Sequence, residues 1–186
     1  MKLTGLQLIA LANRHVDDDI ENIDGIDWIN ECLITLGEDA KVFDTAEVVI
    51  TNTKTWYDLP ANIVRIHEFE DSNGDPSYVN YVIRNGKVKV DTLGTYSIYY
   101  AKLPAEIIPE DSTDAKITIA LSSEIDCHKM LQNAVALFVA SRFKSFDDDE
   151  NRDAARLMQE YELRKAQALK QINDLDNYNN FSIRVM

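Results

Sequence analysis

The sequence of 186 residues has little cysteine, glycine or proline, and it has no long hydrophobic run. Its two cysteines, Cys32 and Cys127, show no CxxC spacing and no surrounding histidines, which disfavours a zinc site and a disulfide framework. Six glycines and four prolines are too few for a fold dominated by loops. No stretch reaches the roughly 20 apolar residues that cross a bilayer. The sequence therefore predicts a soluble globular protein in which both cysteines are buried as small hydrophobic residues.

Positive charge is also scarce, because 19 lysines and arginines stand against 32 aspartates and glutamates. The formal net charge is -13 at pH 7. An acidic surface repels the phosphate backbone, which excludes a general DNA-binding surface. It leaves open a protein that surrounds DNA without gripping it, since an acidic wall lets a polyanion pass with few adhesive contacts.

Catalytic and metal-binding motifs are absent as well. His15, His67 and His128 are far apart in the chain and belong to no HExxH or Ser/His/Asp pattern. The acidic runs at 17–19 and 147–150 lie at predicted helix ends, where carboxylates complement the helix dipole, and neither has the alternating ligand spacing of a cation loop. The sequence predicts no enzyme activity, no cofactor and no metal site.

Helical periodicity occupies both ends of the chain. It predicts one helix from about residue 3 to 14 and a second from about 22 to 36, with Gly37 placed to cap the second. A third helix is predicted to begin after Ser122 or Ser123 and to run to about Phe143. A fourth follows the acidic run, and its apolar side consists of Leu157, Tyr161, Ala168, Ile172 and Leu175.

Between these helices the apolar period changes to two. Runs rich in valine, isoleucine and tyrosine at 47–51, 62–69, 77–84, 87–91 and 96–101 are separated by turn signals. The strongest signal is Asn85-Gly86, because a type I′ turn needs positive φ at both central residues. Asn73-Gly74 supports a second hairpin. The pattern predicts an antiparallel meander of about five strands.

The predicted fold is therefore α+β: a bundle of about four helices that carries an inserted antiparallel β-meander. The bundle comprises residues 1–45 and 122–176, and the β-subdomain comprises residues 46–103. Residues 104–121 are a connection, and residues 177–186 form a C-terminal tail. The two short helices near the N-terminus cannot hold a core alone, so the long later pair must supply the missing surface.

An aromatic cluster, "WYDLP" at residues 56–60, precedes the second strand. Pro60 fixes its own φ and pushes Leu59 toward extended geometry, which marks a boundary between structural parts. We predict that Trp56, Tyr57, Leu59 and Pro60 lie at the seam between the β-subdomain and the bundle. The alternative is a β-module that binds carbohydrate or peptide through its aromatic residues, which are Trp56, Tyr57, Tyr78, Tyr81, Tyr96, Tyr99 and Tyr100.

Four segments carry a family resemblance through their order: "DWINECLITLG", "WYDLPANIVRIHEFEDSNG", "GTYSIYYAKLPAEI" and "LQNAVALFVASRFKSFDDDE". Over residues 20 to 175 the chain resembles the head-tail adaptor (connector) proteins of tailed bacteriophages. The resemblance implies a structural virion protein without catalysis or cofactor. It implies a ring, usually of twelve copies, that docks on the portal and extends the DNA channel towards the tail. Another neck role, as a stopper or tail-completion protein, stays open.

The same resemblance implies the partners and the location. These are the portal protein, further neck or tail proteins and other copies in a dodecameric ring, with a monomer when free. Double-stranded DNA passes through the lumen without specific binding, and the protein resides in the virion neck after assembly in the host cytoplasm. The tail is expected to contact the portal or a neighbour by strand addition or in an apolar groove, through Tyr178, Phe181, Ile183, Arg184 and Val185. The alternative is a tail that is disordered or packs on its own subunit.

Overall fold

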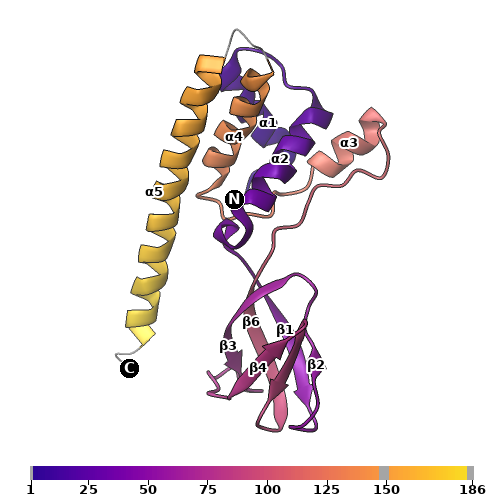
Figure 1. The fold of residues 1–186 in the computed structure, drawn as a ribbon, viewed down its shortest axis with the longest axis vertical. Helices are drawn as coiled ribbons and strands as arrows, with labels where there is room; N and C mark the ends of the chain where they lie inside the picture. The colour runs from indigo at the N-terminus through magenta and orange to yellow at the C-terminus, as the bar shows by residue number, and fades with distance from the viewer. Residues whose placement is uncertain (1, 147–150, 184–186) are drawn as a thin grey trace. The chain divides into compact units, whose positions relative to one another are not determined.

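The computed structural model describes residues 2–146 and 151–183, and it divides into two compact units. The helical unit contains the described residues up to Ala40 and from Pro104 onward, and the β unit is Lys41–Leu103. Figure 1 shows helices in the first unit and strands in the second. The predicted α+β class is confirmed, although the numbers of helices and strands differ from those predicted.

The helical unit contains five α-helices among its described residues, where four were predicted. They are α1 (Gly5–Val16), α2 (Asn22–Leu36), α3 (Asp114–Leu121), α4 (Gln132–Ser145) and α5 (Asn151–Ile183), and a short 3-10 helix, η1 (Gly37–Ala40), follows α2. The helix that the sequence did not reveal is α3, in a segment predicted to be a plain connection. It has only eight residues, and its apolar side chains are not confined to one face: Ile117 and Leu121 are buried, whereas Ile119 is 63% exposed.

The core of the helical unit surrounds α4. This helix packs against α1, α2 and α5, and Figure 1 shows it between α5 and the two N-terminal helices. Every residue from Ala134 to Ser141 is buried. A helix that is apolar all round must be enclosed by other elements, so α4 is the central element that the surrounding helices cover.

Two helix starts differ from the prediction because of contacts that sequence periodicity does not show. Thr4 begins α1 through a capping box, in which its Oγ1 accepts from the Gln7 amide at 3.3 Å. The start of α4, at Gln132, lies eight or nine residues later than predicted. The preceding segment pairs instead with the N-terminus, where the Ile125 amide donates to the Leu3 carbonyl at 2.9 Å. The predicted span of α2 is confirmed.

The β unit consists of two antiparallel sheets of three strands each. Its strands are β1 (Val42–Ile50), β2 (Tyr57–Asp58), β3 (Ile63–Glu70), β4 (Tyr81–Arg84), β5 (Lys87–Val90) and β6 (Gly94–Lys102). The sheets have the orders β1-β6-β3 and β2-β5-β4. The predicted five-strand meander is therefore wrong, because the first strand pairs with the last along its whole length, from Val42↔Lys102 to Ile50↔Gly94.

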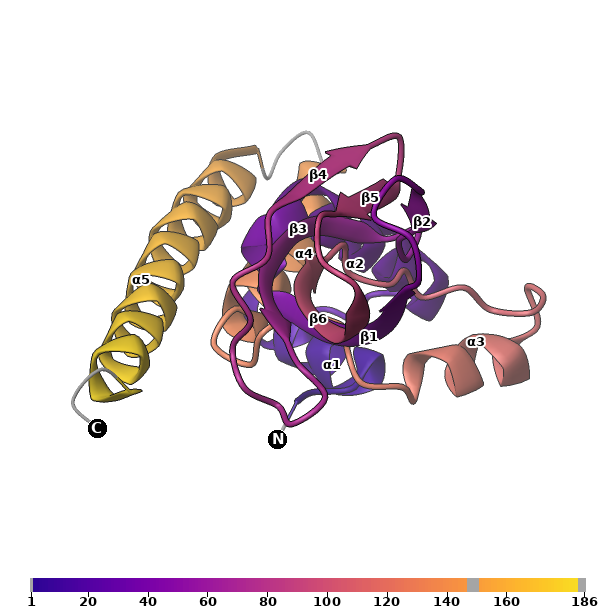
Figure 2. The same cartoon turned by 90° about the horizontal axis from the view of Figure 1, so that it is seen from below.

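The two sheets enclose one apolar interior, which Figure 2 shows surrounded by strands. In β6, Tyr96, Ile98 and Tyr100 alternate with more exposed residues and point into this interior. The predicted Asn85-Gly86 turn is confirmed between β4 and β5, with φ of 53° and 70° at its central residues. The turn chemistry was local, so the sequence could show it, whereas closure of the sheet by β1 and β6 depends on residues far apart in the chain.

The C-terminal segment also differs from the expectation of a separate, strand-prone tail. Residues 177–183 continue α5 as far as Ile183. Helix propagation adds one hydrogen bond for each residue that joins an existing helix, so a long helix extends readily into a segment with no strand partner. Arg184 and Val185 lie outside the described residues.

Candidate interaction surfaces

The aromatic cluster at residues 56–60 is held inside the β unit. The Tyr57 hydroxyl accepts from the amides of Thr51 and Asn52, at 2.9 and 2.8 Å, and so closes the loop that follows β1. Its hydrogen bonds, the Thr51 hydroxyl first among them, lower the pKa of Tyr57. Leu59 is buried in the apolar interior, and its amide donates to the Gly86 carbonyl at 2.9 Å. These two residues therefore have structural roles within the β unit.

The other members of the cluster lie nearer the surface. Trp56 is 36% exposed and Pro60 is partly buried. Asp58 forms an ion pair with Lys87 on the neighbouring strand β5, at 2.6 Å. The predicted position of Trp56, Tyr57, Leu59 and Pro60 at a seam with the helical bundle stays a prediction.

The aromatic residues of the β unit do not form one binding platform. Tyr96 and Tyr100 are 5% and 4% exposed in the interior, so they are unavailable to a carbohydrate or peptide. Sequence reasoning missed a different cluster on the outer face of the first sheet. There the ring of Phe43 lies 5.1 Å from His67 and 5.4 Å from Tyr99, between centroids. The register places Thr45 opposite Tyr99, so Phe43, two residues before Thr45, is a diagonal neighbour of Tyr99 on the same face. Strand parity alone does not reveal this pairing.

The predicted docking residues at the C-terminus fall on the end of α5. The backbone places Tyr178, Phe181 and Ile183 on its last turns, and Arg184 and Val185 are outside the described residues. Their contact with the portal or with a neighbour stays a prediction. Leu175, expected on the buried side of this helix, is 50% exposed and lines a shallow apolar hollow with Met130.

A second surface that the sequence did not reveal lies on the outer side of α2. Asp24 and Asp27 are exposed there, and Ile34 is 64% exposed further along the same side. At its margin, the Trp28 ring lies 5.6 Å from the ring of Phe146, which is 78% exposed at the end of α4. Isolated exposed apolar residues are ordinary, but aromatic and aliphatic residues rimmed by acids resemble the core and rim of an interface.

The outer side of α5 has the opposite charge. Four exposed residues lie along the line furthest from the buried side, at the spacing i, i+4, i+11 and i+18: Arg152, Arg156, Leu163 and Lys170. The acids of this stretch lie to either side, where Asp153 and Glu160 pair with Arg156 and Arg164 at 3.5 and 3.9 Å. Exposed pairs of this kind contribute little to stability, so they can exchange for other partners.

Among the described residues, the thiols and the metal-ligating side chains were the remaining candidates for a chemical site. Cys32 and Cys127 are fully buried and unbridged, as predicted, and burial raises the pKa of both thiols to about 12. Burial likewise raises the pKa of Tyr161. Within residues 2–146 and 151–183, no group of three or more histidine, cysteine, aspartate or glutamate side chains could hold a metal ion. No helix in these ranges has both the length and the apolar character to cross a membrane.

The described residues therefore form an enclosed helical core with charged outer helix faces, and a separate small β unit. The chain matches the SU10 adaptor protein family over residues 3–185, and it belongs to this family. No curated protein matches it. The resemblance to phage head-tail adaptors is confirmed, and an adaptor family of structural phage proteins is not an enzyme family. The family indicates a location in the virion and contacts with other phage head and tail proteins.

Proposed function

We propose that this protein is a head-tail adaptor that docks as a ring on the portal and extends the DNA channel towards the tail. The observation that carries the proposal is the family match across residues 3–185, which includes both units and the end of α5. A ring of twelve copies fits a protein whose partner is itself a ring, since equivalent subunits then make equivalent contacts.

The charge of the chain supports a passive role towards DNA. With a net charge of -13, the protein repels a duplex in the lumen more than it binds it. Weak adhesion suits a channel, because each strong phosphate contact would slow the passage of DNA. The adaptor therefore needs affinity for proteins and little affinity for nucleic acid.

The end of α5 is the proposed portal contact. Residues 177–183 extend this helix, and Tyr178, Phe181 and Ile183 provide large apolar side chains for a groove on the portal or on a neighbour. We also propose that Trp56, Tyr57, Leu59 and Pro60 lie at the seam between the β unit and the helical bundle.

Co-sedimentation with the purified cognate portal tests this function. The full chain is expected to travel with the portal, and Phe181→Ser combined with Ile183→Ser is expected to weaken binding at least tenfold. Ile119→Ser is the matched control, because Ile119 is an exposed apolar residue on a different helix, α3. Absence of the full chain from the portal fraction contradicts the adaptor proposal. Binding only to a portal already loaded with another neck protein would instead assign a stopper or tail-completion role.

A further inference from the structure

The two outer helix faces of the helical unit are complementary to each other. Residues 17–40, which include α2, contain nine aspartates and glutamates and no lysine or arginine. Residues 152–170 of α5 contain five lysines and arginines and three acids, in a chain whose net charge is strongly negative. Opposite charge is thus concentrated on two different helices of the same unit.

The order of residues along the two helices also matches. On α2, the acids Asp24 and Asp27 come first and the exposed Ile34 follows seven residues after Asp27. On α5, the cations Arg152 and Arg156 come first and Leu163, 58% exposed, follows seven residues after Arg156. Seven residues of helix correspond to about 10 Å in both cases. The distance along the helix from the charged residue to the exposed aliphatic residue is therefore the same on the two faces.

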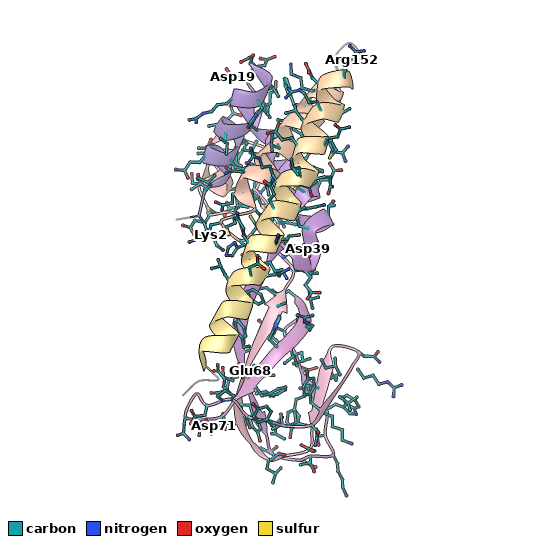
Figure 3. The ribbon with its side chains drawn as sticks, turned by 90° about the vertical axis from the view of Figure 1, so that its left-hand side faces the viewer. Lys2, Asp19, Asp39, Glu68, Asp71 and Arg152 are labelled. Carbon is teal, nitrogen blue, oxygen red and sulfur yellow. The ribbon has the colours of Figure 1, made fainter. Side chains whose placement is uncertain are left out.

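The two helices run in the same direction from one end of the helical unit. Figure 3 shows Asp19, just ahead of α2, and Arg152, at the start of α5, at one end of this unit. Asp39, which follows α2, lies further from that end in the same view. Both helices therefore begin towards the same end of the helical unit and run away from it.

We propose that the outer face of α5 in one copy packs against the outer face of α2 in a second copy. The α5 face is Arg152, Arg156, Leu163 and Lys170, and the α2 face is Asp24, Asp27 and Ile34. The contact deepens the proposed function, on which it rests, by naming the surfaces that join neighbouring subunits of the ring. Rotation about an axis parallel to the helices keeps their common direction, so the α5 face of one copy can run parallel to the α2 face of the next.

Electrostatics favours this pairing over a symmetric one. Two α2 faces placed together would bring acids against acids, in a protein that already carries an excess of negative charge. Joining α5 to α2 replaces that repulsion with attraction and uses a different surface on each copy. Such heterologous contacts generate closed rings when the rotation closes. The Trp28 and Phe146 rings beside Asp27 add aromatic surface on which an arginine of the neighbour can stack.

Reciprocal charge reversal tests the interface. One variant carries Asp24→Arg with Asp27→Arg, and the other carries Arg152→Glu with Arg156→Glu. In a ring of either variant alone, the α2 face and the α5 face that meet carry charge of the same sign and repel each other. The number of copies bound to the portal is therefore expected to fall about tenfold. In an equal mixture, the reversed α2 face of one variant attracts the reversed α5 face of the other, and the two unreversed faces attract each other as in the wild type. The number of copies bound to the portal is therefore expected to recover. Far-UV circular dichroism verifies that both variants are folded.

A control variant separates the interface from net charge. Glu47→Arg with Asp75→Arg makes the same change in charge as the α2 variant, at two exposed positions of the β unit. It is expected to load like the wild type. Loading of the α2 or α5 variant at the wild-type level, or no recovery in the mixture, would overturn the inference. If Arg152→Glu with Arg156→Glu weakens retention of duplex DNA but leaves loading unchanged, the α5 face is a DNA contact and the inference is wrong.

A second measurement needs no portal and keeps this inference distinct from the proposed function. Equal amounts of ¹⁴N- and ¹⁵N-labelled protein are concentrated and treated with a zero-length carbodiimide reagent. The amine and the carboxylates that could react lie beyond the two aliphatic residues of the contact: Lys170 follows Leu163 by seven residues, and Glu38 and Asp39 follow Ile34 by four and five. Mixed-isotope cross-links from Lys170 to Glu38 or Asp39 are expected, and their absence from both free and portal-bound protein contradicts the contact. Cross-links without portal docking would support the interface and refute the portal function.

Discussion

The link between α2 and the segment that precedes α3 gives the sharpest test of the structure. The Asn30 side chain holds the backbone of Ile107 through two hydrogen bonds: it donates to the Ile107 carbonyl at 2.9 Å and accepts from the Ile107 amide at 2.8 Å. Both residues are partly buried. An amide side chain that satisfies one backbone donor and one acceptor replaces the pairing that a neighbouring strand would provide.

Replacement of Asn30 by alanine removes both bonds. Each is worth about 1 kcal/mol net, and the partly buried backbone groups left without partners add to the cost. Alanine recovers about 0.6 kcal/mol through its higher helix propensity. The expected net loss is about 2 kcal/mol for opening of this segment, which corresponds to about 30-fold faster exchange of the Ile107 amide.

Amide hydrogen exchange resolved at single residues provides the assay. The Ala105 amide serves as an internal reference, because it donates to Asp126 at 2.9 Å and does not depend on Asn30. Asn173→Ala is the matched control: Asn173 is exposed within α5, so this change alters helix propensity without removing the bonds to Ile107. An unchanged exchange rate at Ile107 in Asn30→Ala would refute the reasoning, since its protection would then come from another contact.

Three further predictions concern single positions. Gly86 has φ of 70°, and a side chain at this position would meet open space, so any loss on substitution comes from the backbone conformation. Gly86→Val is expected to lower the free energy of unfolding in urea by about 1–2 kcal/mol, and Gly86→Asn by less, because asparagine tolerates positive φ better. Equal losses for the two variants would contradict this conformational cause. Hydrogen bonds from the backbone amides of Asn73 and, second, Asp75 lower the pKa of Asp71 in the folded protein. The ionised Asp71 carboxylate therefore stabilises the turn fully above the pKa that Asp71 has in the unfolded chain, and this stabilisation is lost as the pH falls through the lower pKa of the folded protein. The amide signals of residues 71–75 in NMR spectra are therefore expected to show that the turn loosens below about pH 4. An identical pH response in Asp71→Asn would exclude the Asp71 carboxylate as its cause. The raised thiol pKa of Cys32 and Cys127, about 12, predicts slow reaction with a thiol reagent at pH 8 and complete reaction in urea; rapid labelling of the native protein would contradict their burial.

Local patterns explain which parts of the fold could be predicted. The span of α2 followed from apolar spacing and Gly37, and the Asn85-Gly86 turn followed from the φ values that these residues tolerate. The pairing of β1 with β6 could not be predicted in this way, because it joins Val42 to Lys102 across sixty residues of chain. Periodicity indicates which side of a strand is buried, but it carries no information about which strand lies beside it.

The candidate surfaces divide in the same way. Tyr57 and Leu59 near Pro60 were visible in the sequence, and only the hydrogen bonds of the Tyr57 hydroxyl and the burial of Leu59 show that these two residues stabilise the β unit. The faces of α2 and α5 were not identified from the sequence. Their charges were readable, but which side of each helix faces outward depends on how both pack around α4.

By itself, the sequence determined the α+β class, the absence of catalytic motifs and the resemblance to phage adaptors, because these depend on composition, period and the order of segments. The tertiary structure decided which strands pair, where α4 begins, that a further helix forms at Asp114–Leu121, and that Leu163 and Ile34 are exposed. These outcomes depend on long-range contacts, whose free energy comes from residues that only the folded chain brings together.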